Sequence, residues 1–261
     1  MLSKYQFFLV KEEDRIATIT INRPPANALS SPLLQELSAI FDELESDDKV
    51  KVVVLHGHGR FFAAGADIKE FTTVEKGSDF EKLGEYGQIL FNRIEQFSKP
   101  VIAAVHGAAL GGGLELAMAC HIRLVSENCK LGLPELQLGL IPGFAGSQRL
   151  PRYVGVAKAA EMLLTSEPIT GSESVALGLA NHAYQEDELL EKTYELANKL
   201  TKKSAVSMKL ALQLLTYVNE YNFQDGVKKE AELFGAAFDS HDGQEGINAF
   251  LEKRPAQFKD E

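Results

Sequence analysis

Two glutamates lie among apolar residues in the middle of the chain. Glu115 stands between Leu114 and Leu116, and Glu135 follows Pro134 in an equally apolar stretch. Burial moves the pKa of a glutamate from about 4.3 toward about 6–7, where its carboxyl group exchanges protons near neutral pH. The residues alone leave two interpretations open: an acid–base pair for catalysis, or two glutamates that cap a helix or form a salt bridge.

Two runs of small residues could bring backbone N–H groups to one cleft. The first is residues 61–70 (FFAAGADIKE), and the second is residues 111–113 (GGG), just before Glu115. Small side chains let a backbone approach a ligand closely, and the N–H groups at a helix start favour negative charge. Together the turns predict an oxyanion hole, in which one donor is commonly worth about 2.7–4 kcal/mol. Each turn alone is equally typical of an ordinary tight turn.

Other catalytic motifs are absent from the sequence. It contains no G-x-G-x-x-G dinucleotide fingerprint, no phosphate loop of the G-x-x-x-x-G-K-[ST] type and no G-x-S-x-G nucleophile turn. His56 and His58 form a close pair without an HExxH motif or a Cys/His cluster, which favours loop histidines over metal ligands. Metal, hydride and serine-nucleophile chemistry therefore lose support, and we predict no metal site.

The composition is that of an acidic globular protein. Its 261 residues include 27 Lys and Arg against 37 Asp and Glu, a net charge of −10. This length fits one large domain, or a core with an appendage, and the charge argues against nucleic acid or an anionic membrane as a partner. Cys120 and Cys129 form no paired motif and are expected to be two buried thiols. With no signal peptide evident at the N-terminus, we expect a cytoplasmic protein.

Residues 101–120 are apolar enough to suggest a membrane span, with His106 and Glu115 as the clearly polar residues. A glutamate near the centre of a spanning helix costs about 2.5–3.5 kcal/mol. The three glycines at 111–113 would also break such a helix. We therefore expect a strand, a glycine turn and a short helix.

Strands that alternate with helices predict an α/β fold with several parallel strands. Three runs rich in apolar and β-branched residues, 50–55, 101–105 and 122–125, are typical of strands buried on both faces. Residues 7–10 and 16–22 flank a polar turn and predict a hairpin.

Apolar residues at helical spacing predict a helix over residues 32–44, with Ser31 as its N-cap and Pro32 in its first position. Similar spacing predicts helices over 80–97 and 114–120. From about Ser147 onward nearly all of the chain is expected to be helical, with the change of role near residue 195. The helices expected there are 189–200, 204–218 and 226–238.

Taken together, the sequence resembles the crotonase family, and within it the enoyl-CoA hydratases most closely. The resemblance implies an α/β fold, the crotonase spiral of ββα units, over residues 1–195. It also implies a helical section for oligomerisation over 196–261, which builds homotrimers or hexamers. The matching segments are 62–70, 99–107, 111–117, 133–135, 139–143, 148–152 and 250–254.

The resemblance also implies roles for individual residues in binding an acyl-CoA substrate. The backbone N–H groups of Ala66 and Gly112 would hold the thioester carbonyl oxygen. Phe250 and Lys253 would meet the CoA tail, in a neighbouring subunit. The other residues expected to bind the substrate are Ala64, Asp67, Ile68 and Lys69.

By the same resemblance, Glu115 would activate water for the β-carbon and Glu135 would give a proton to the α-carbon. The activity implied is that of a hydro-lyase, an enoyl-CoA hydratase that converts trans-2-enoyl-CoA to 3-hydroxyacyl-CoA, as in fatty-acid β-oxidation. No cofactor is implied, because the CoA thioester is itself the substrate. The alternatives are an enoyl-CoA isomerase or another acyl-CoA lyase of the family, and a non-catalytic RNA-binding or scaffold relative. Isomerases of the family generally lack the acid at position 115, so having both glutamates favours hydration.

A physical argument suggests the same division of labour. Glu115 should lie in the first turn of a helix, where the macrodipole stabilises an ionised carboxylate, while Glu135 lacks that support. We therefore expect Glu115 as the base and Glu135 as the protonated acid.

Four further residues are expected to have roles outside the proton transfers. His121 is expected to be structural, and Phe144, in place of a smaller residue of the family pattern, to shape the acyl pocket. Arg149 and Arg152 are expected to form structural ion pairs.

The net charge of −10 describes the whole surface, so it does not exclude CoA, whose phosphates could meet local cations such as Lys69 and Lys253.

Overall fold

The computed structural model describes residues 4–72, 76–220 and 223–261. Within these residues the chain forms a six-stranded sheet and a smaller three-stranded sheet. In the larger sheet β1 is antiparallel to β2 and every other pairing is parallel. Its strands, in spatial order, are β1 (Phe8–Glu13), β2 (Ile16–Ile21), β3 (Val52–Gly57), β4 (Val101–Val105), β6 (Ile122–Ser126) and β9 (His182–Tyr184). The smaller sheet contains β5 (Ala108–Leu110), β7 (Lys130–Gly132) and β8 (Ile169–Thr170).

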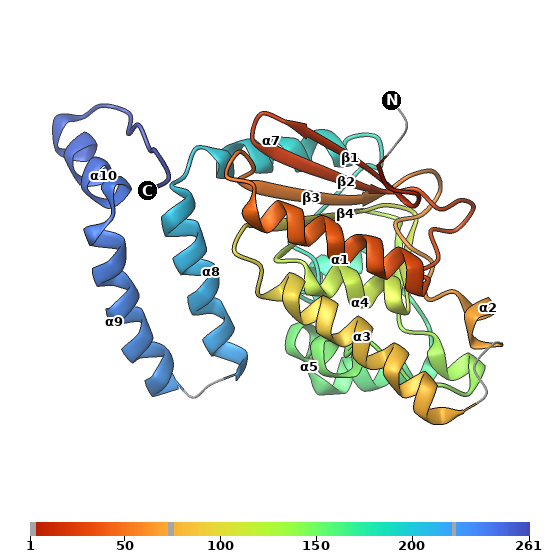
Figure 1. Cartoon of the computed structure of the whole chain (residues 1–261). Coiled ribbons are helices and arrows are strands. Elements are labelled where there is room, and N and C mark those ends of the chain that lie inside the picture. Colours follow the sequence, from red (N-terminus) through yellow and green to blue (C-terminus); the bar gives the residue numbers. More distant parts are fainter. Residues whose placement is uncertain (1–3, 73–75, 221–222) are drawn as a thin grey trace.

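Helices cover both faces of the larger sheet (Figure 1). The alternating side chains of β3 show this: Val53 and Leu55 pack in one apolar cluster with helices α1, α3 and α4, while Val52 and Val54 pack in another with α7. Burial on both faces explains why the central strands read as continuous apolar runs, as predicted. The helices on these faces are α1 (Ser31–Ser46), α3 (Gly77–Glu95), α4 (Gly112–Ala119) and α7 (Leu189–Thr201).

The first helix confirms the predicted pattern with one correction at its start. Leu33, Leu37 and Phe41 lie on its buried face, but the N-cap is Ser30 rather than Ser31. The side-chain oxygen of Ser30 accepts the N–H of Leu33 at 3.4 Å, and Pro32 lies in the first turn. Either serine satisfies the sequence rule, and the backbone conformation at residue 30 decides between them.

The region after Ser147 is less uniformly helical than predicted. It contains the long helix α5 (Gly146–Thr165), but also β8, the short helix α6 (Gly171–Ala176) and β9. β9 pairs in parallel with β6 and completes the larger sheet, with Leu124 opposite His182. Strands of two or three residues are too short to show alternation, so partner strands define them rather than their own sequence.

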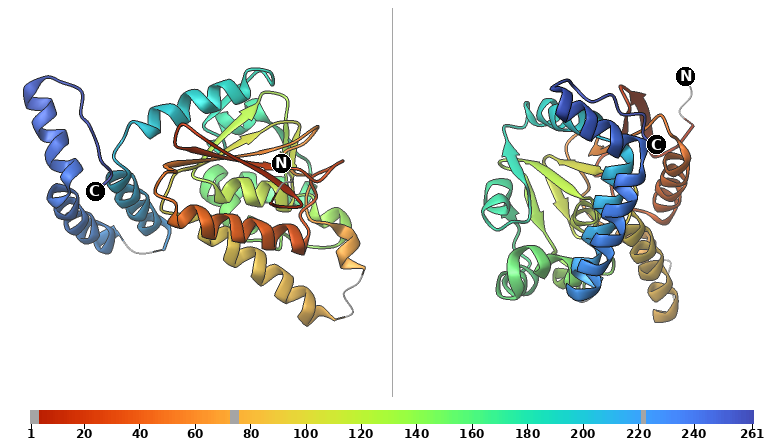
Figure 2. Two further views of the ribbon diagram at one scale, coloured as in Figure 1. Left: turned by 45° about the horizontal axis from the view of Figure 1, so that its top comes forward. Right: turned by 90° about the vertical axis from the view of Figure 1, so that its left-hand side faces the viewer.

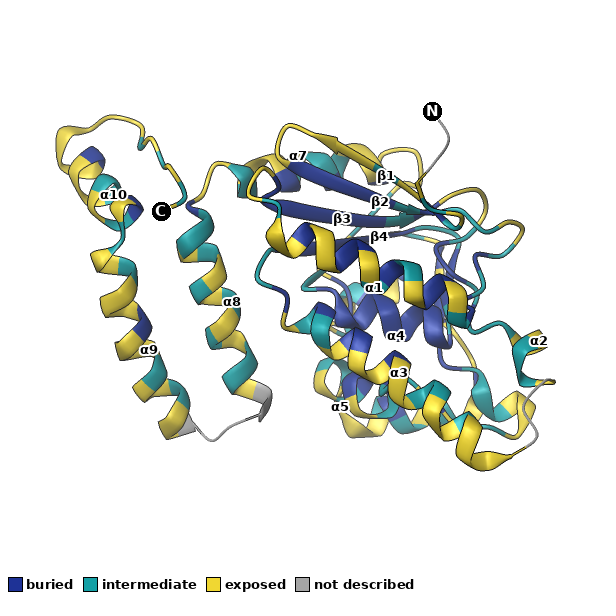
Figure 3. Cartoon of the chain, in the orientation of Figure 1, coloured by how far each residue is buried: buried dark blue, intermediate teal, exposed yellow. Residues whose placement is uncertain are grey.

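The last three helices form an arm at one end of the molecule (Figures 1 and 2). They are α8 (Ala205–Glu220), α9 (Phe223–Asp239) and α10 (His241–Glu252), of which α10 lies in the stretch expected to be helical but was given no range of its own. The predicted boundary at residue 195 lies inside α7, whose Leu189 and Ala197 are buried against the sheet. The core therefore extends through Thr201, and the arm begins at Ala205. Figure 3 shows the contrast between the buried central elements and the largely exposed arm.

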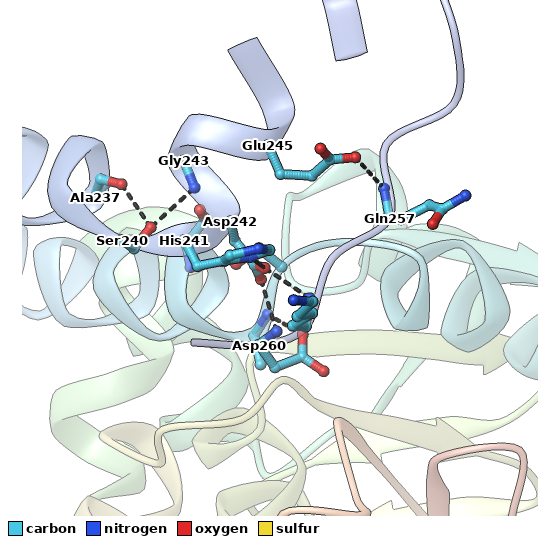
Figure 4. A network of polar contacts seen from close by, with 12 residues as sticks. Ala237, Ser240, His241, Asp242, Gly243, Glu245, Gln257 and Asp260 are labelled. Carbon is cyan, nitrogen blue, oxygen red and sulfur yellow. Dashed lines mark hydrogen bonds and ion pairs between the residues drawn. The ribbon is translucent and has the colours of Figure 1, made fainter. Parts of the chain in front are cut away.

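The C-terminal segment ties the arm back to the sheet through two aspartates (Figure 4). The Asp242 carboxylate accepts the backbone N–H groups of Lys259 at 2.7 Å and Asp260 at 2.9 Å. Asp260 in turn pairs with Lys51 at 2.6 Å and Arg15 at 2.5 Å, at the start of the core strands. Burial alone would raise the pKa of Asp260, but these cations and the N–H of Ala205 outweigh it and hold the pKa below its ordinary value.

Removal of this carboxylate should destabilise the protein strongly. The Lys51 side chain is only 3% exposed, so Asp260→Ala leaves a buried ammonium group without its anion. We expect a loss of roughly 3 kcal/mol in the free energy of unfolding, measured by urea denaturation. Glu195→Ala, which breaks an exposed ion pair with Lys192, should leave the midpoint almost unchanged. Equal midpoints for the two variants would contradict the proposed role of the tail.

Candidate active site

The two small-residue turns predicted from the sequence lie side by side. Ala63 pairs with β5: its N–H donates to the carbonyl of Ala108 at 3.2 Å, and its carbonyl accepts the N–H of Leu110 at 3.1 Å. A Cβ atom placed on Gly111 would lie 3.9 Å from the Cα of Gly65. The turn after β3 and the turn before α4 therefore meet at one point.

The backbone directs two N–H groups into the space at this point. Leu29 bonds to the carbonyl of Gly65 and to the N–H of Asp67, both at 2.8 Å, so the intervening N–H of Ala66 points away from Leu29. Gly112 is the first residue of α4, where no preceding helical turn supplies a carbonyl. Among the described residues, neither N–H has a hydrogen-bond acceptor, and both residues line the same cavity.

Close packing of α4 requires the glycines of this turn. A Cβ on Gly113 would lie 2.1 Å from the carbonyl oxygen of Ala63, and one on Gly111 would lie 2.9 Å from Oε1 of Glu135. Gly111 also has φ +51°, which a residue with a side chain adopts at a cost. The run of three glycines thus lets the helix start touch its neighbours.

The cavity has a volume of about 650 Å³ and a mostly apolar wall. Both predicted catalytic glutamates, Glu115 and Glu135, reach it, as do both predicted oxyanion residues. Ala64 and Ile68, two of the predicted substrate-binding residues, line it as well. Its larger apolar side chains are Phe71, Phe80, Leu83, Leu138, Leu140, Ile141 and Phe144.

Glu115 is held rigidly at the back of the cavity. Its side chain is buried, and Oε1 accepts the N–H of Phe144 at 2.8 Å and of Gly146 at 2.7 Å. Arg149 fixes that loop from the other side, since it donates to the carbonyl of Phe144 at 3.0 Å and pairs with Glu95 at 2.8 Å. The carboxylate therefore has one oxygen fixed by backbone donors.

Burial dominates the electrostatics of both glutamates. Burial, with a smaller contribution from the charge of Glu135, raises the pKa of Glu115 to about 7, although the two N–H donors oppose the rise. The surroundings of Glu115 therefore go against the expectation that the helix start keeps this carboxyl group ionised, because burial favours its protonated form. Burial also raises the pKa of Glu135, whose Oε2 is buried and has no hydrogen-bond partner in the described part of the chain. Glu115 can therefore exchange protons near neutral pH, and the pKa of Glu135 is shifted in the same direction.

Comparisons with known proteins show the family of this chain. A model of the family described as enoyl-CoA hydratase/isomerase matches residues 11–261. The chain is 56% identical over 247 residues to a probable enoyl-CoA hydratase of Bacillus subtilis strain 168, covering 94% of this chain and 96% of the relative. The chain belongs to the enoyl-CoA hydratase/isomerase family. It is also 41% identical to a short-chain-enoyl-CoA hydratase of Clostridium acetobutylicum, covering 94% and 95% of the two chains.

A solved structure extends the likeness to three dimensions. The crystal structure of an enoyl-CoA hydratase from Bacillus anthracis matches with a TM-score of 0.93 at 34% identity, covering 98% of this chain and all of that one. The predicted crotonase-type α/β fold with a helical C-terminal section is therefore confirmed.

Four of the eight predicted substrate-binding residues do not line the cavity, and Asp67 and Lys69 are two of them. Asp67 caps the short helix α2 (Ile68–Phe71), accepting the N–H of Lys69 at 3.1 Å, and pairs with Arg23 at 2.5 Å. The hydrogen bond from Arg23 holds the pKa of Asp67 below its ordinary value. Lys69 is exposed beside Ile68, at the rim. Asp67 is thus a structural residue of the turn.

Phe250 and Lys253 lie outside the site of their own chain. Both are exposed, one near the end of α10 and the other capping it, while α2 lies at the opposite end of the molecule (Figure 1). They can meet a CoA tail in the predicted way only if they belong to a second copy of the chain.

Sequence reasoning missed the residues that hold Glu115. Gly146 donates an N–H to the carboxylate, and a Cβ on it would lie 2.8 Å from Oε1. Its signal in the sequence was the glycine-containing run from Gly143. Arg149 was predicted correctly as an ion-pair partner, and Arg152 joins it on Glu95 at 3.2 Å. The hydrogen bond from Arg149 to the carbonyl of Phe144 became visible only in the structure.

The remaining titratable candidates have structural surroundings. His121 accepts the N–H of Val101 at 2.9 Å, and burial lowers its pKa to about 4, which confirms a structural role. Cys120 and Cys129 are buried as predicted, which raises the pKa of each thiol to about 12.

Over residues 4–72, 76–220 and 223–261, no group of His, Cys, Asp or Glu is arranged to hold a metal ion. None of the helices described there is long and apolar enough to span a membrane.

The contact between Gly113 and Ala63 leads to a stability prediction. Gly113→Ala must push α4 away from the Ala63 carbonyl, so we expect a loss of about 1–3 kcal/mol in the free energy of unfolding. Gly235→Ala is the matched control, because a Cβ there contacts nothing and the helix gains propensity worth about 1 kcal/mol. Urea unfolding of both variants tests this, and a neutral Gly113→Ala would show that the contact is not tight.

Burial of Glu115 predicts a dependence of stability on pH. Because its folded pKa of about 7 lies above the ordinary 4.5, its favourable contribution is complete below pH 4.5 and is lost as the pH rises through 7. Glu115→Gln keeps an oxygen for the two N–H donors and cannot ionise. Its stability relative to the wild type should rise by on the order of 3 kcal/mol between these limits, measured by urea unfolding. The exposed Glu12→Gln variant is the control, and a parallel pH profile for Glu115→Gln would refute the assignment.

Proposed function

We infer that this protein is an enoyl-CoA hydratase, a hydro-lyase that adds water to trans-2-enoyl-CoA to give 3-hydroxyacyl-CoA. One observation carries the inference: the buried carboxyl group of Glu115, the half-buried Glu135 and two unpaired backbone N–H groups of the described structure face the same cavity. The relatives named as enoyl-CoA hydratases support it.

We propose that the N–H groups of Ala66 and Gly112 donate to the carbonyl oxygen of the thioester. Negative charge grows on this oxygen as water attacks the β-carbon, because the double bond is conjugated with the carbonyl. Donors fixed in advance stabilise that charge, and the start of α4 adds the positive end of its dipole. The thioester is itself the electron sink, so the reaction calls for no metal or redox group.

The two glutamates divide the proton transfers. Glu115 takes a proton from water as the water oxygen bonds to the β-carbon, and Glu135 gives a proton to the α-carbon. The double bond becomes a single bond, and the proton that Glu115 gained must return to Glu135 before the next turnover. Because the charge on Glu135 raises the pKa of Glu115, the pair favours holding one proton between them at neutral pH. Hydration proceeds when this proton lies on Glu135, which then acts as the acid and leaves Glu115 ionised to act as the base.

Hydration is favoured over isomerisation for a chemical reason. An isomerase moves one proton between two carbons, which a single carboxyl group can do. A second carboxyl group, the buried Glu115, with one oxygen fixed by two N–H donors, fits the activation of water. The net charge of −10 disfavours the RNA-binding alternative.

We also propose a homotrimer or hexamer built through the arm, in which Phe250 and Lys253 of a second copy meet the CoA tail. The support is the exposure of large apolar side chains on α9 and α10, including Phe234 at 77% and Phe250 at 83%. The proposed setting is cytoplasmic fatty-acid degradation.

The hydration of crotonyl-CoA tests the function. The wild type should remove the absorbance of the enoyl thioester, and Glu135→Gln should lower kcat by about 10²–10⁴ while acyl-CoA affinity stays similar. The exposed Glu12→Gln variant should keep wild-type turnover. An unaffected rate in Glu135→Gln would refute its role, and a wild type that binds crotonyl-CoA without hydrating it would refute the hydratase assignment.

A further inference from the structure

Phe144 occupies a slot made by two glycines. A Cβ placed on Gly87 of α3 would lie 2.2 Å from its ring, and one placed on Gly112 of α4 would lie 3.1 Å from it. The ring also packs edge-on against Phe91, with centroids 5.3 Å apart at 74°. The aromatic ring therefore fills the space that these two helices leave open.

The backbone of Phe144 leaves the ring little freedom to move elsewhere. Its N–H donates to Glu115 at 2.8 Å and its carbonyl accepts from Arg149 at 3.0 Å. Because both backbone groups are engaged beside the reaction centre, the side chain must leave the loop at a fixed place.

The ring stands between two cavities. The cavity of about 650 Å³ described above and a smaller one of about 110 Å³ share a wall that includes Phe144. The smaller cavity reaches α1, where Leu34 is buried and Gln35 is exposed. The carboxylate of its Glu70 accepts the N–H of Ser31 at 2.9 Å and its hydroxyl at 3.1 Å. The four residues common to both cavities are Ala66, Phe71, Leu83 and Phe144.

We propose that Phe144 determines the acyl chain length of this enzyme by closing the smaller cavity to the substrate. The inference rests on the proposed hydratase function, which places the thioester oxygen at the N–H groups of Ala66 and Gly112. The ring lies directly beside Gly112, so acyl carbons that extend past the β-carbon meet its edge. The wild type therefore accepts short chains, and removal of the ring opens the smaller cavity, with Leu29 and Leu34 in its wall, to longer ones.

The test compares kcat/KM for crotonyl-CoA and trans-2-decenoyl-CoA. Apolar pockets discriminate chain length by about 10-fold or more. Phe144→Ala should therefore raise the ratio of the long to the short substrate at least about ten-fold over the wild type. Ile141→Ala is the control, because Ile141 lines only the larger of these two cavities, and it should change both substrates alike.

A second substitution tests the route of the chain. Gln35 lines the smaller cavity and is exposed on α1, so Gln35→Trp can block that cavity without disturbing the core. Added to Phe144→Ala, it should return the ratio to the wild-type value. An unchanged ratio in Phe144→Ala, or a raised ratio that Gln35→Trp leaves raised, would overturn the proposal.

Failure of a variant to fold and failure of the hydratase function can both be distinguished from a loss of chain-length selectivity. If Phe144→Ala does not fold, Phe144→Leu retains an apolar side chain and must raise the ratio in the same direction, and no rise would overturn the proposal. If the wild type hydrates neither substrate, the hydratase function itself fails. Unfolding midpoints and the affinity for butyryl-CoA, a saturated analogue, distinguish loss of the fold from loss of selectivity.

Discussion

The close approach of α4 to the turn after β3 is the contact on which the rest of the site depends. The Ala63 carbonyl lies where a Cβ of Gly113 would be, so glycine alone lets the helix start reach this position. That contact brings the N–H groups of Ala66 and Gly112 to one cavity and carries Glu115 to its back wall. A fixed pair of donors costs no reorganisation when charge develops, which is the source of their catalytic value.

The second constraint is the burial of a carboxyl group. Glu115 is 1% exposed, and water that would stabilise its charge is replaced by two N–H groups from the loop that Arg149 fixes. Burial outweighs those donors, so the pKa of Glu115 rises. At neutral pH the buried carboxyl group therefore lowers the free energy of unfolding of the protein. Such groups are common where acid–base chemistry is needed.

The acidic surface and a phosphate-bearing substrate are compatible because they concern different parts of the molecule. A net charge of −10 acts over the whole surface, whereas the thioester meets backbone dipoles in a mostly apolar cavity. Lys69 lies beside the rim, and Lys253 lies on the arm, where only another copy could bring it to the site. The arm and the core are joined by the pairing of Asp260 with Lys51 and Arg15.

Elements with strong periodicity and residues with unusual chemistry could be predicted from the amino-acid sequence alone. Buried strands such as residues 52–57, both glutamates and the glycine turn were readable because burial and backbone conformation restrict residue type locally. Short strands such as β9, the capping role of Asp67 and the N–H donors of Gly146 were not, because each depends on a partner distant in sequence. The burial that raises the pKa of Glu115, and the position of Phe144 between two cavities, became visible only in three dimensions. Both facts arise from packing between α3, α4 and the loop before α5, which no single segment encodes.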